Sequence, residues 1–208
     1  MYTHSKQIIT AGTPAAQATG ALVMLHGRGG SAQDIVSLSR SLNTAGLAIY
    51  APQATNNSWY PYSFVAPDAQ NQPALNSALQ VVGELVGDII AQGIPANKIY
   101  FAGFSQGACL TLEYITRNAQ RYAGAVGFTG GLIGEHFEPT KYTGDFVGTP
   151  VLITTGNPDS HIPLQRVEES IAQLESMGAM VTSKVYAGRA HTISLDEVRL
   201  ANEVVFGG

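Results

Sequence analysis

The feature that most constrains the fold of this chain is the stretch IYFAGFSQGACL, residues 99–110. The apolar run Ile99–Ala102 favours a buried strand, and the residues after the glycine-rich part place apolar side chains at helical spacing. A strand that turns abruptly into a helix strains the residue at the turn, and the positions two before and two after it must be small. Gly103 and Gly107 meet that need. The stretch therefore predicts a sharp strand–turn–helix with Ser105 at the turn.

The rest of the chain alternates between short strand-like runs and longer helix-like runs. Runs typical of strands cover Gln7–Thr10, Ala21–His26, Gly46–Ala51, Lys98–Phe104, Ala123–Thr129, Val151–Thr155 and Met180–Tyr186. Apolar residues at helical spacing predict helices over Ala32–Asn43, Ala74–Gln92, Gln106–Asn118, Leu164–Met177 and Ser194–Val205. This alternation indicates an α/β fold with a mostly parallel sheet of about seven strands, covered by helices on both faces. Ligands of such sheets bind at the carboxyl ends of the strands, where Ser105 lies.

Length and composition predict one globular domain over residues 1–208. Hydrophobic residues make up 45% of the chain and charged residues only 12%, which is not a disordered composition. A chain of 208 residues can bury a sizeable core, and a second domain of ordinary size would be cramped. No repeat or low-complexity linker divides the sequence, so we place no domain boundary.

The charge distribution and the single cysteine indicate which kinds of partner and which cellular compartment to expect. The net charge is −4, and the eleven lysines and arginines are scattered, which argues against a nucleic-acid partner. The sequence has no basic amphipathic face, no signal-peptide core and no apolar run of about twenty residues, so we expect no membrane insertion. The single Cys109 excludes an intrachain disulfide and suits a reducing compartment. We therefore expect a cytoplasmic protein.

The serine of Gly-x-Ser-x-Gly is the strongest candidate for a catalytic group. At the predicted turn its hydroxyl projects beside the N-terminus of the following helix, where negative charge is stabilised. The pentapeptide alone is a weak signal, because glycine-rich turns are common. The strand before it and the helix after it favour a nucleophile over a purely structural turn. A serine needs a base to take its proton, so this interpretation requires an acid and then a histidine further along the chain.

Loop positions select His191 as the base and Asp159 as the acid. His191 follows the last predicted strand by a short loop, and Asp159 follows the strand before it in the loop GNPDSHIP. The other histidines precede the serine, fall in an irregular segment or share the loop of the acid: His4, His26, His136 and His161. A turn or capping role is the alternative for Asp159, since aspartate is common in both.

Two backbone N–H groups are predicted to form an oxyanion hole, which holds the charged oxygen during acyl transfer. One belongs to Gln106, directly after the nucleophile. The other comes from the loop of LHGRGGSAQD, and we assign it to Arg28. A phosphate-binding loop is the alternative for these glycines, but it needs Gly-Lys-Ser/Thr, and this loop has no lysine.

Four ordered motifs, LHGRGGSAQD, GFSQGACL, GNPDSHIP and GRAHTI, resemble those of the bacterial phospholipase/carboxylesterase family of α/β-hydrolases, relatives of the acyl-protein thioesterases. The likeness covers practically the whole chain. It implies a triad of Ser105, Asp159 and His191 and an oxyanion hole made by the Arg28 and Gln106 N–H groups. It also implies a three-layer α/β-hydrolase fold without a large lid, no cofactor, and often a homodimer.

One departure from that family bears on the substrate. Acyl-protein thioesterases usually carry an acidic residue shortly after the tryptophan of the segment APQATNNSWYPYSF, whereas Tyr60, Pro61 and Tyr62 follow Trp59 here. This difference favours a carboxylesterase of small esters over protein depalmitoylation.

Four side chains near predicted strand ends are candidates for the substrate pocket: Trp59, Tyr60, Phe104 and Leu132. Binding sites are mostly apolar with few polar groups, so these residues suit an acyl or aromatic pocket beside the serine. The alternative for each is ordinary packing of a loop onto the sheet.

Two other reactive residue types have structural interpretations. Cys109 is expected to be a small buried core residue rather than a reactive thiol. His26 is expected to form hydrogen bonds within its loop and not to bind a metal, because no second ligand at metal spacing accompanies it.

Together the residues predict a serine carboxylesterase that acts on a small-molecule ester. Thioester or lysophospholipid cleavage by the same machinery is the first alternative, and only substrate profiling separates these activities. The second alternative is a non-catalytic ligand-binding protein on the same fold. A missing triad residue would mark that protein, and none is missing.

Overall fold

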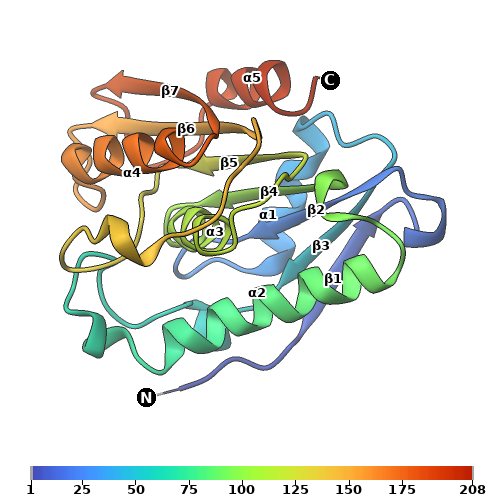
Figure 1. Ribbon diagram of the computed structural model, residues 1–208, viewed down its shortest axis with the longest axis horizontal. Helices are drawn as coiled ribbons and strands as arrows, with labels where there is room; N and C mark the ends of the chain where they lie inside the picture. Colours follow the sequence, from blue (N-terminus) through green and yellow to red (C-terminus); the bar gives the residue numbers. More distant parts are fainter. Residues whose placement is uncertain (1, 208) are drawn as a thin grey trace.

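A computed structural model of the chain describes residues 2–207. Its centre is a seven-stranded sheet with the strand order β1-β3-β2-β4-β5-β6-β7 (Figure 1). The strands span β1 Ile8–Gly12, β2 Gly20–Leu25, β3 Leu47–Pro52, β4 Ile99–Phe104, β5 Gly124–Phe128, β6 Pro150–Asn157 and β7 Met180–Ala187. β1 pairs antiparallel with β3, and every other pair is parallel. The carboxyl ends of β2 to β7 therefore point the same way.

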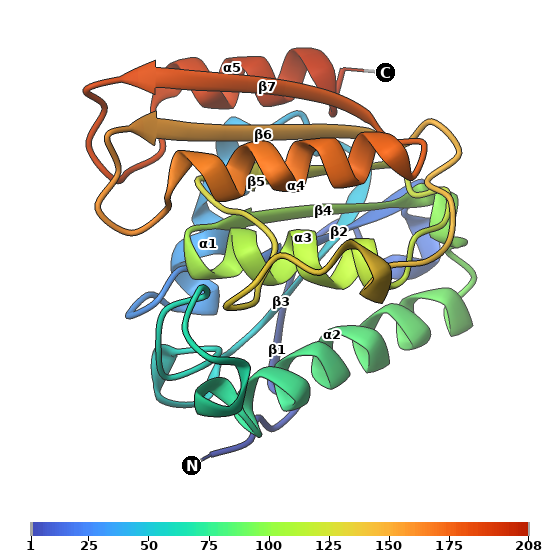
Figure 2. The ribbon, with the colours of Figure 1, turned by 60° about the vertical axis from the view of Figure 1, so that its left-hand side comes forward.

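Helices cover both faces of this sheet: α1 Ala32–Leu38, α2 Ala74–Ala91, α3 Gln106–Arg117, α4 Leu164–Ser176 and α5 Leu195–Val204. One face carries α2, α3 and α4, and the other carries α1 and α5 (Figure 2). Successive strand residues serve opposite layers, as the pleat requires. Val23 packs in the first hydrophobic cluster and Met24 in the second. Short 3₁₀ turns span Ala15–Gln17, Ser39–Ser41, Thr55–Asn57, Asp68–Asn71, Ala96–Lys98 and Pro139–Lys141.

The predicted order of strands and helices is confirmed, and the differences lie at element ends. β6 runs on to Asn157 because it pairs with β7 along its whole length. α1 ends at Leu38 and not at Asn43. The Ser39 hydroxyl donates back to the Val36 carbonyl at 2.7 Å, which gives that carbonyl a local partner where the helix tightens into a 3₁₀ turn.

The helix α2 is notably apolar. By length and composition alone, Ala74–Ala91 could cross a membrane. In the structure, however, eight of its residues are buried, and seven of these pack in the cluster on one face of the sheet. A helix that covers a sheet inside a globular protein meets the same criteria, so packing accounts for its composition.

Candidate active site

The predicted strand–turn–helix is confirmed at Ser105. The backbone of this serine has φ 53° and ψ −118°, between the end of β4 and the start of α3. Residues other than glycine rarely adopt a positive φ. A Cβ at Gly103 would collide with the Gly107 carbonyl, and one at Gly107 would collide with the Leu25 carbonyl. The turn thus needs glycine at both positions, and it leaves the serine hydroxyl projecting at the end of the strand.

A chain of hydrogen bonds joins Ser105, His191 and Asp159. The distance from His191 Nε2 to Ser105 Oγ is 2.7 Å, and that from His191 Nδ1 to Asp159 Oδ2 is 2.8 Å. A carboxylate only accepts, so Nδ1 carries the proton and Nε2 is left to accept from the serine. The three residues follow β4, β6 and β7, which run parallel in the sheet. Sequence reasoning chose these residues, and the structure brings them together.

Burial and hydrogen bonding act in opposite directions on Asp159. Its side chain is 0% exposed, and burial by itself raises the pKa of a carboxyl group. Hydrogen bonds from His191 and from the backbone N–H groups of His161 and Ile162 outweigh this effect and hold the pKa of Asp159 below its usual value. The carboxylate is therefore charged at neutral pH and orients the imidazole.

Arg189 holds the loop that carries His191. Its guanidinium donates to Thr129 Oγ1 at 2.6 Å, which ties the loop to the end of β5. The same group donates to the carbonyls of Ala190 and Thr192, on either side of the histidine. These bonds fix the backbone on both sides of the imidazole.

Glu197, in the first turn of α5, is the carboxylate next to the Arg189 guanidinium. Its carboxylate is 0% exposed and lies 3.6 Å from Arg189 Nε. It also accepts the hydroxyl of Thr154 at 2.6 Å and the N–H of Ser194 at 2.8 Å. Sequence reasoning missed this pair. The capping box Ser194-x-x-Glu197 signals a helix start, but nothing in the local pattern links it to β6 or to the histidine loop.

Arg28 and Gln106, the predicted oxyanion-hole residues, line the same cavity as Ser105. Gln106 is the first residue of α3, where backbone N–H groups have no partner within the helix. Arg28 lies in the loop between β2 and α1. The structure thus places both residues at the nucleophile.

The side chains of these two residues bind the segment 58–62, a role that the sequence did not indicate. The Gln106 amide accepts the Trp59 N–H and donates to the Tyr60 carbonyl, both at 2.8 Å. The Arg28 guanidinium donates to Ser58 Oγ and to two carbonyls of the same segment. The loop is therefore anchored to the elements that carry the proposed oxyanion donors.

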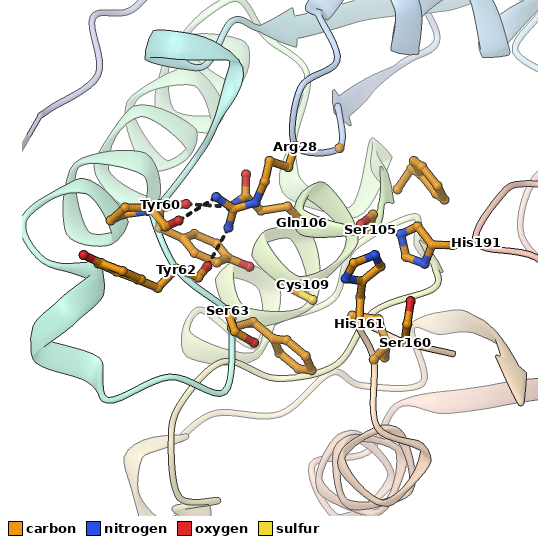
Figure 3. Close-up of a pocket in the computed structure, with 15 residues that line it drawn as sticks. Arg28, Tyr60, Tyr62, Ser63, Ser105, Gln106, Cys109, Ser160, His161 and His191 are labelled. Atoms are coloured by element: carbon orange, nitrogen blue, oxygen red, sulfur yellow. Dashed lines mark hydrogen bonds between the residues drawn. The ribbon is translucent and has the colours of Figure 1, made fainter. Parts of the chain in front are cut away.

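A cavity of about 540 Å³ opens beside Ser105. The segment 60–64 forms one wall, and the loops that carry His161 and His191 form the opposite one (Figure 3). Tyr60 and Phe104 border it, as expected from the sequence.

Trp59 and Leu132 do not border this cavity, which corrects the expectation for both. Each is 0% exposed. The Trp59 ring packs on the His26 ring, and its indole N–H donates to the His26 carbonyl at 2.9 Å, so this side chain fastens the loop to β2 from within. The Leu132 side chain lies in the hydrophobic cluster, and its N–H donates to Ser170 Oγ in α4.

His161 lies at the cavity beside His191. The two ring centroids are 5.0 Å apart, with the rings nearly perpendicular. From the sequence alone, His161 is the alternative candidate for the base. Its backbone N–H donates to the Asp159 carboxylate, but His191 makes the hydrogen bond to the serine.

Cys109 and His26 have the structural surroundings that the sequence led us to expect. Cys109 is buried below the cavity, and burial raises the pKa of its thiol to about 12. His26 Nδ1 bonds to the Gly27 carbonyl at 2.8 Å, and Nε2 accepts the Ala54 N–H at 3.2 Å. Within residues 2–207, no cluster of three or more His, Cys, Asp and Glu side chains could hold a metal ion.

The family profile, the curated relatives and the solved structures that resemble this chain agree with one another. The profile of the phospholipase/carboxylesterase family matches residues 6–205. A phospholipase/carboxylesterase from Dyadobacter fermentans has a solved structure with 64% identity and a TM-score of 0.98, covering 99% of both chains. A probable carboxylesterase SOBER1-like of Arabidopsis thaliana is 27% identical over 86% of this chain and 74% of its own length. Acyl-protein thioesterase 1 of Eremothecium gossypii is 28% identical over 64% of this chain and 57% of its own length.

Proposed function

Because this chain belongs to the phospholipase/carboxylesterase family of ester hydrolases, we propose that it is a serine carboxylesterase that cleaves small carboxylic esters through an acyl-enzyme. In this proposal Ser105 is the nucleophile and His191 is the general base and acid. Asp159 holds the imidazole in the reactive tautomer.

The hydrogen-bond chain from Asp159 through His191 to Ser105 carries the proposal. His191 Nε2 takes the hydroxyl proton while Ser105 Oγ attacks the ester carbonyl carbon, and then gives that proton to the departing alcohol. Water next loses a proton to the same nitrogen and attacks the acyl-enzyme, which releases the acid and restores the serine. The charged Asp159 stabilises the imidazolium formed in each step.

The start of α3 and the loop after β2 supply the proposed oxyanion hole. The Gln106 N–H lies at a helix N-terminus, where the helix dipole favours negative charge. The Arg28 N–H belongs to a loop that is tied to the segment 58–62, so both donors sit in a fixed framework before the substrate arrives.

The size of the cavity supports small esters as substrates. About 540 Å³ lies within the range of roughly 300–1,000 Å³ that is usual for small-molecule sites. The tyrosine and phenylalanine side chains on its walls suit an apolar acyl or alcohol group.

The test is hydrolysis of p-nitrophenyl esters of increasing acyl length by the wild type and by Ser105→Ala. We expect the wild type to hydrolyse short esters best and Ser105→Ala to lose activity. Ser160→Ala is the matched control, because Ser160 borders the same cavity. An inactive but folded wild type, or a Ser105→Ala variant with undiminished activity, would contradict the proposal.

Thioester cleavage is a second candidate on the same machinery, since one relative is named an acyl-protein thioesterase. Matched oxygen and sulfur esters of one acid separate the two activities. A much larger kcat/KM for long-chain thioesters than for short oxygen esters would favour the thioesterase.

A further inference from the structure

In the described part of the chain, the cavity is bordered by basic side chains and not by acidic ones. Arg28, His161 and His191 border it, and no aspartate or glutamate does among the residues that the structure describes. This differs from the chain as a whole, which has a net charge of −4. At a pH where both imidazoles are neutral, Arg28 is the permanent charge on the wall.

The Arg28 guanidinium is held in place by neutral acceptors. It donates to Ser58 Oγ at 3.1 Å, to the Pro61 carbonyl at 2.7 Å and to the Tyr62 carbonyl at 2.5 Å. These bonds use both hydrogens of Nη1 and one of Nη2. Within residues 2–207, no carboxylate lies at ion-pair distance from this guanidinium. The charge of Arg28 is therefore not paired within the described part of the chain, and its remaining N–H groups can donate to a ligand. The three hydrogen bonds fix the orientation of the guanidinium.

The Tyr60 hydroxyl is a second donor on the same wall. Tyr60 is 1% exposed and borders the cavity, with its ring 6.0 Å from the centre of the Arg28 guanidinium. Its hydroxyl faces the Cys109 thiol at the floor of the cavity, and no oxygen or nitrogen of the described part of the chain accepts from it (Figure 3). A thiol sulfur is a weak acceptor, so a ligand oxygen would be a better partner for this buried hydroxyl.

We propose that the natural substrate is an ester that also bears a free carboxylate, and that Arg28 and Tyr60 bind this carboxylate. Figure 3 shows these two side chains on one side of Ser105, with His191 on the other. An ester carbonyl at the serine then places the rest of the substrate toward the arginine and the tyrosine. A guanidinium edge and a hydroxyl are donors that suit carboxylate oxygens. This inference rests on the proposed esterase function and names the class of its substrate.

The first arm of the test compares charged esters with neutral esters of the same length, at pH 8 and low ionic strength. For the acyl half, the ethyl half-esters of succinate, glutarate and adipate are compared with ethyl butanoate, pentanoate and hexanoate. For the alcohol half, 3-acetoxypropanoate is compared with propyl acetate. We expect kcat/KM for a charged member to exceed that of its partner by about tenfold or more, as for one hydrogen-bonded charge. The series that shows the preference identifies which half carries the carboxylate.

The second arm uses variants of the two proposed donors. Arg28→Gln should bring the ratio of charged to neutral kcat/KM close to one, because the ratio cancels any uniform loss of rate. Arg40→Gln, at an exposed arginine outside the cavity, should leave the ratio unchanged. Tyr60→Phe should lower the ratio severalfold with little change in Tm, because its hydroxyl has only the weakly accepting Cys109 thiol beside it in the protein. A purely structural tyrosine would leave the ratio unchanged.

The outcomes separate this inference from the proposed function. If neutral esters are hydrolysed at Ser105 and neither charged series is preferred, the inference is overturned and the esterase function stands. It is also overturned if Arg28→Gln keeps the full preference. If no ester of any kind is hydrolysed by the folded protein, the esterase function fails, and this inference fails with it.

Discussion

Two pairs of side chains, His191 with Asp159 and Arg28 with Tyr60, lie on opposite sides of the cavity and differ in how their polar atoms are satisfied. On the wall of the acid and histidine loops, His191 and Asp159 are fully engaged with each other, with Ser105 and with backbone N–H groups. On the opposite wall, Arg28 keeps free donors, and the Tyr60 hydroxyl has no oxygen or nitrogen acceptor among the residues described.

This difference separates two tasks. Groups that must hold one orientation during a reaction are bound by the protein itself, since the loss of one partner leaves a buried polar atom unsatisfied. Groups that meet a ligand are left with donors that only the ligand can use. The side chains around His191 are thus held in place by the protein before the substrate binds. The free donors of Arg28 and Tyr60 find oxygen acceptors only in the substrate.

The largest expected effect comes from a substitution of Asp159, whose carboxylate orients the His191 imidazole. Asp159→Asn keeps the shape but offers an amide that favours the wrong imidazole tautomer, so kcat should fall by about 10³- to 10⁴-fold. Steady-state kinetics on a short p-nitrophenyl ester measure this change. Asn157→Ala, at the exposed end of β6, is the control and should stay near the wild-type rate. A fall of less than about tenfold for Asp159→Asn would mean that the carboxylate does not orient the base.

The next largest effect is expected for Glu197→Gln, which removes the charge opposite Arg189. The buried guanidinium is then left without its carboxylate, and we expect the free energy of unfolding to fall by about 3 kcal/mol. Since Arg189 fixes the backbone around His191, kcat should fall as well. Urea unfolding and kinetics measure the two effects. Asp196→Asn, an adjacent residue in exposed ion pairs, should cost at most about 1 kcal/mol.

A smaller effect is expected in the pH dependence of stability. The native pKa of Asp159 is below its unfolded value of about 4. The stability that this carboxylate contributes is therefore fully present above that value and is lost as the pH falls through the native pKa. Unfolding free energies of the wild type and Asp159→Asn, measured from pH 3 to 8, should differ most near neutrality and converge in acid. A difference that grows toward low pH would contradict the lowered pKa.

The smallest effect is expected at Cys109, on the floor of the cavity. Its thiol has a pKa of about 12 and is buried, so it is almost wholly protonated at pH 8. Iodoacetamide at that pH should leave the native protein unlabelled and its activity unchanged, while the unfolded chain is labelled. Rapid labelling of the native protein would show that the floor opens to solvent.

Sequence reasoning found the parts of this molecule that depend on local pattern. The strands and helices follow from hydrophobic period, and the turn at Ser105 follows from the two glycines around it. The placement of Asp159 and His191 after neighbouring strands follows from the order of the chain, although their catalytic roles stay predictions.

The parts that sequence reasoning missed depend on contacts between distant segments. Trp59 follows a strand end like its neighbour Tyr60, but its indole turns inward to the His26 carbonyl, and no period predicts that. Glu197 reaches Thr154 and Arg189 across separate elements, and only the assembled sheet brings them together.

The most direct test of the central claim is the rate at which a fluorophosphonate labels Ser105, followed by intact-mass and peptide mass spectrometry. The account predicts one label per chain, on Ser105, formed in the wild type and slowed by at least about a thousandfold in folded His191→Gln, because the base is lost. Labelling on another residue, or an equal rate in the two proteins, would contradict the activation of Ser105 by His191.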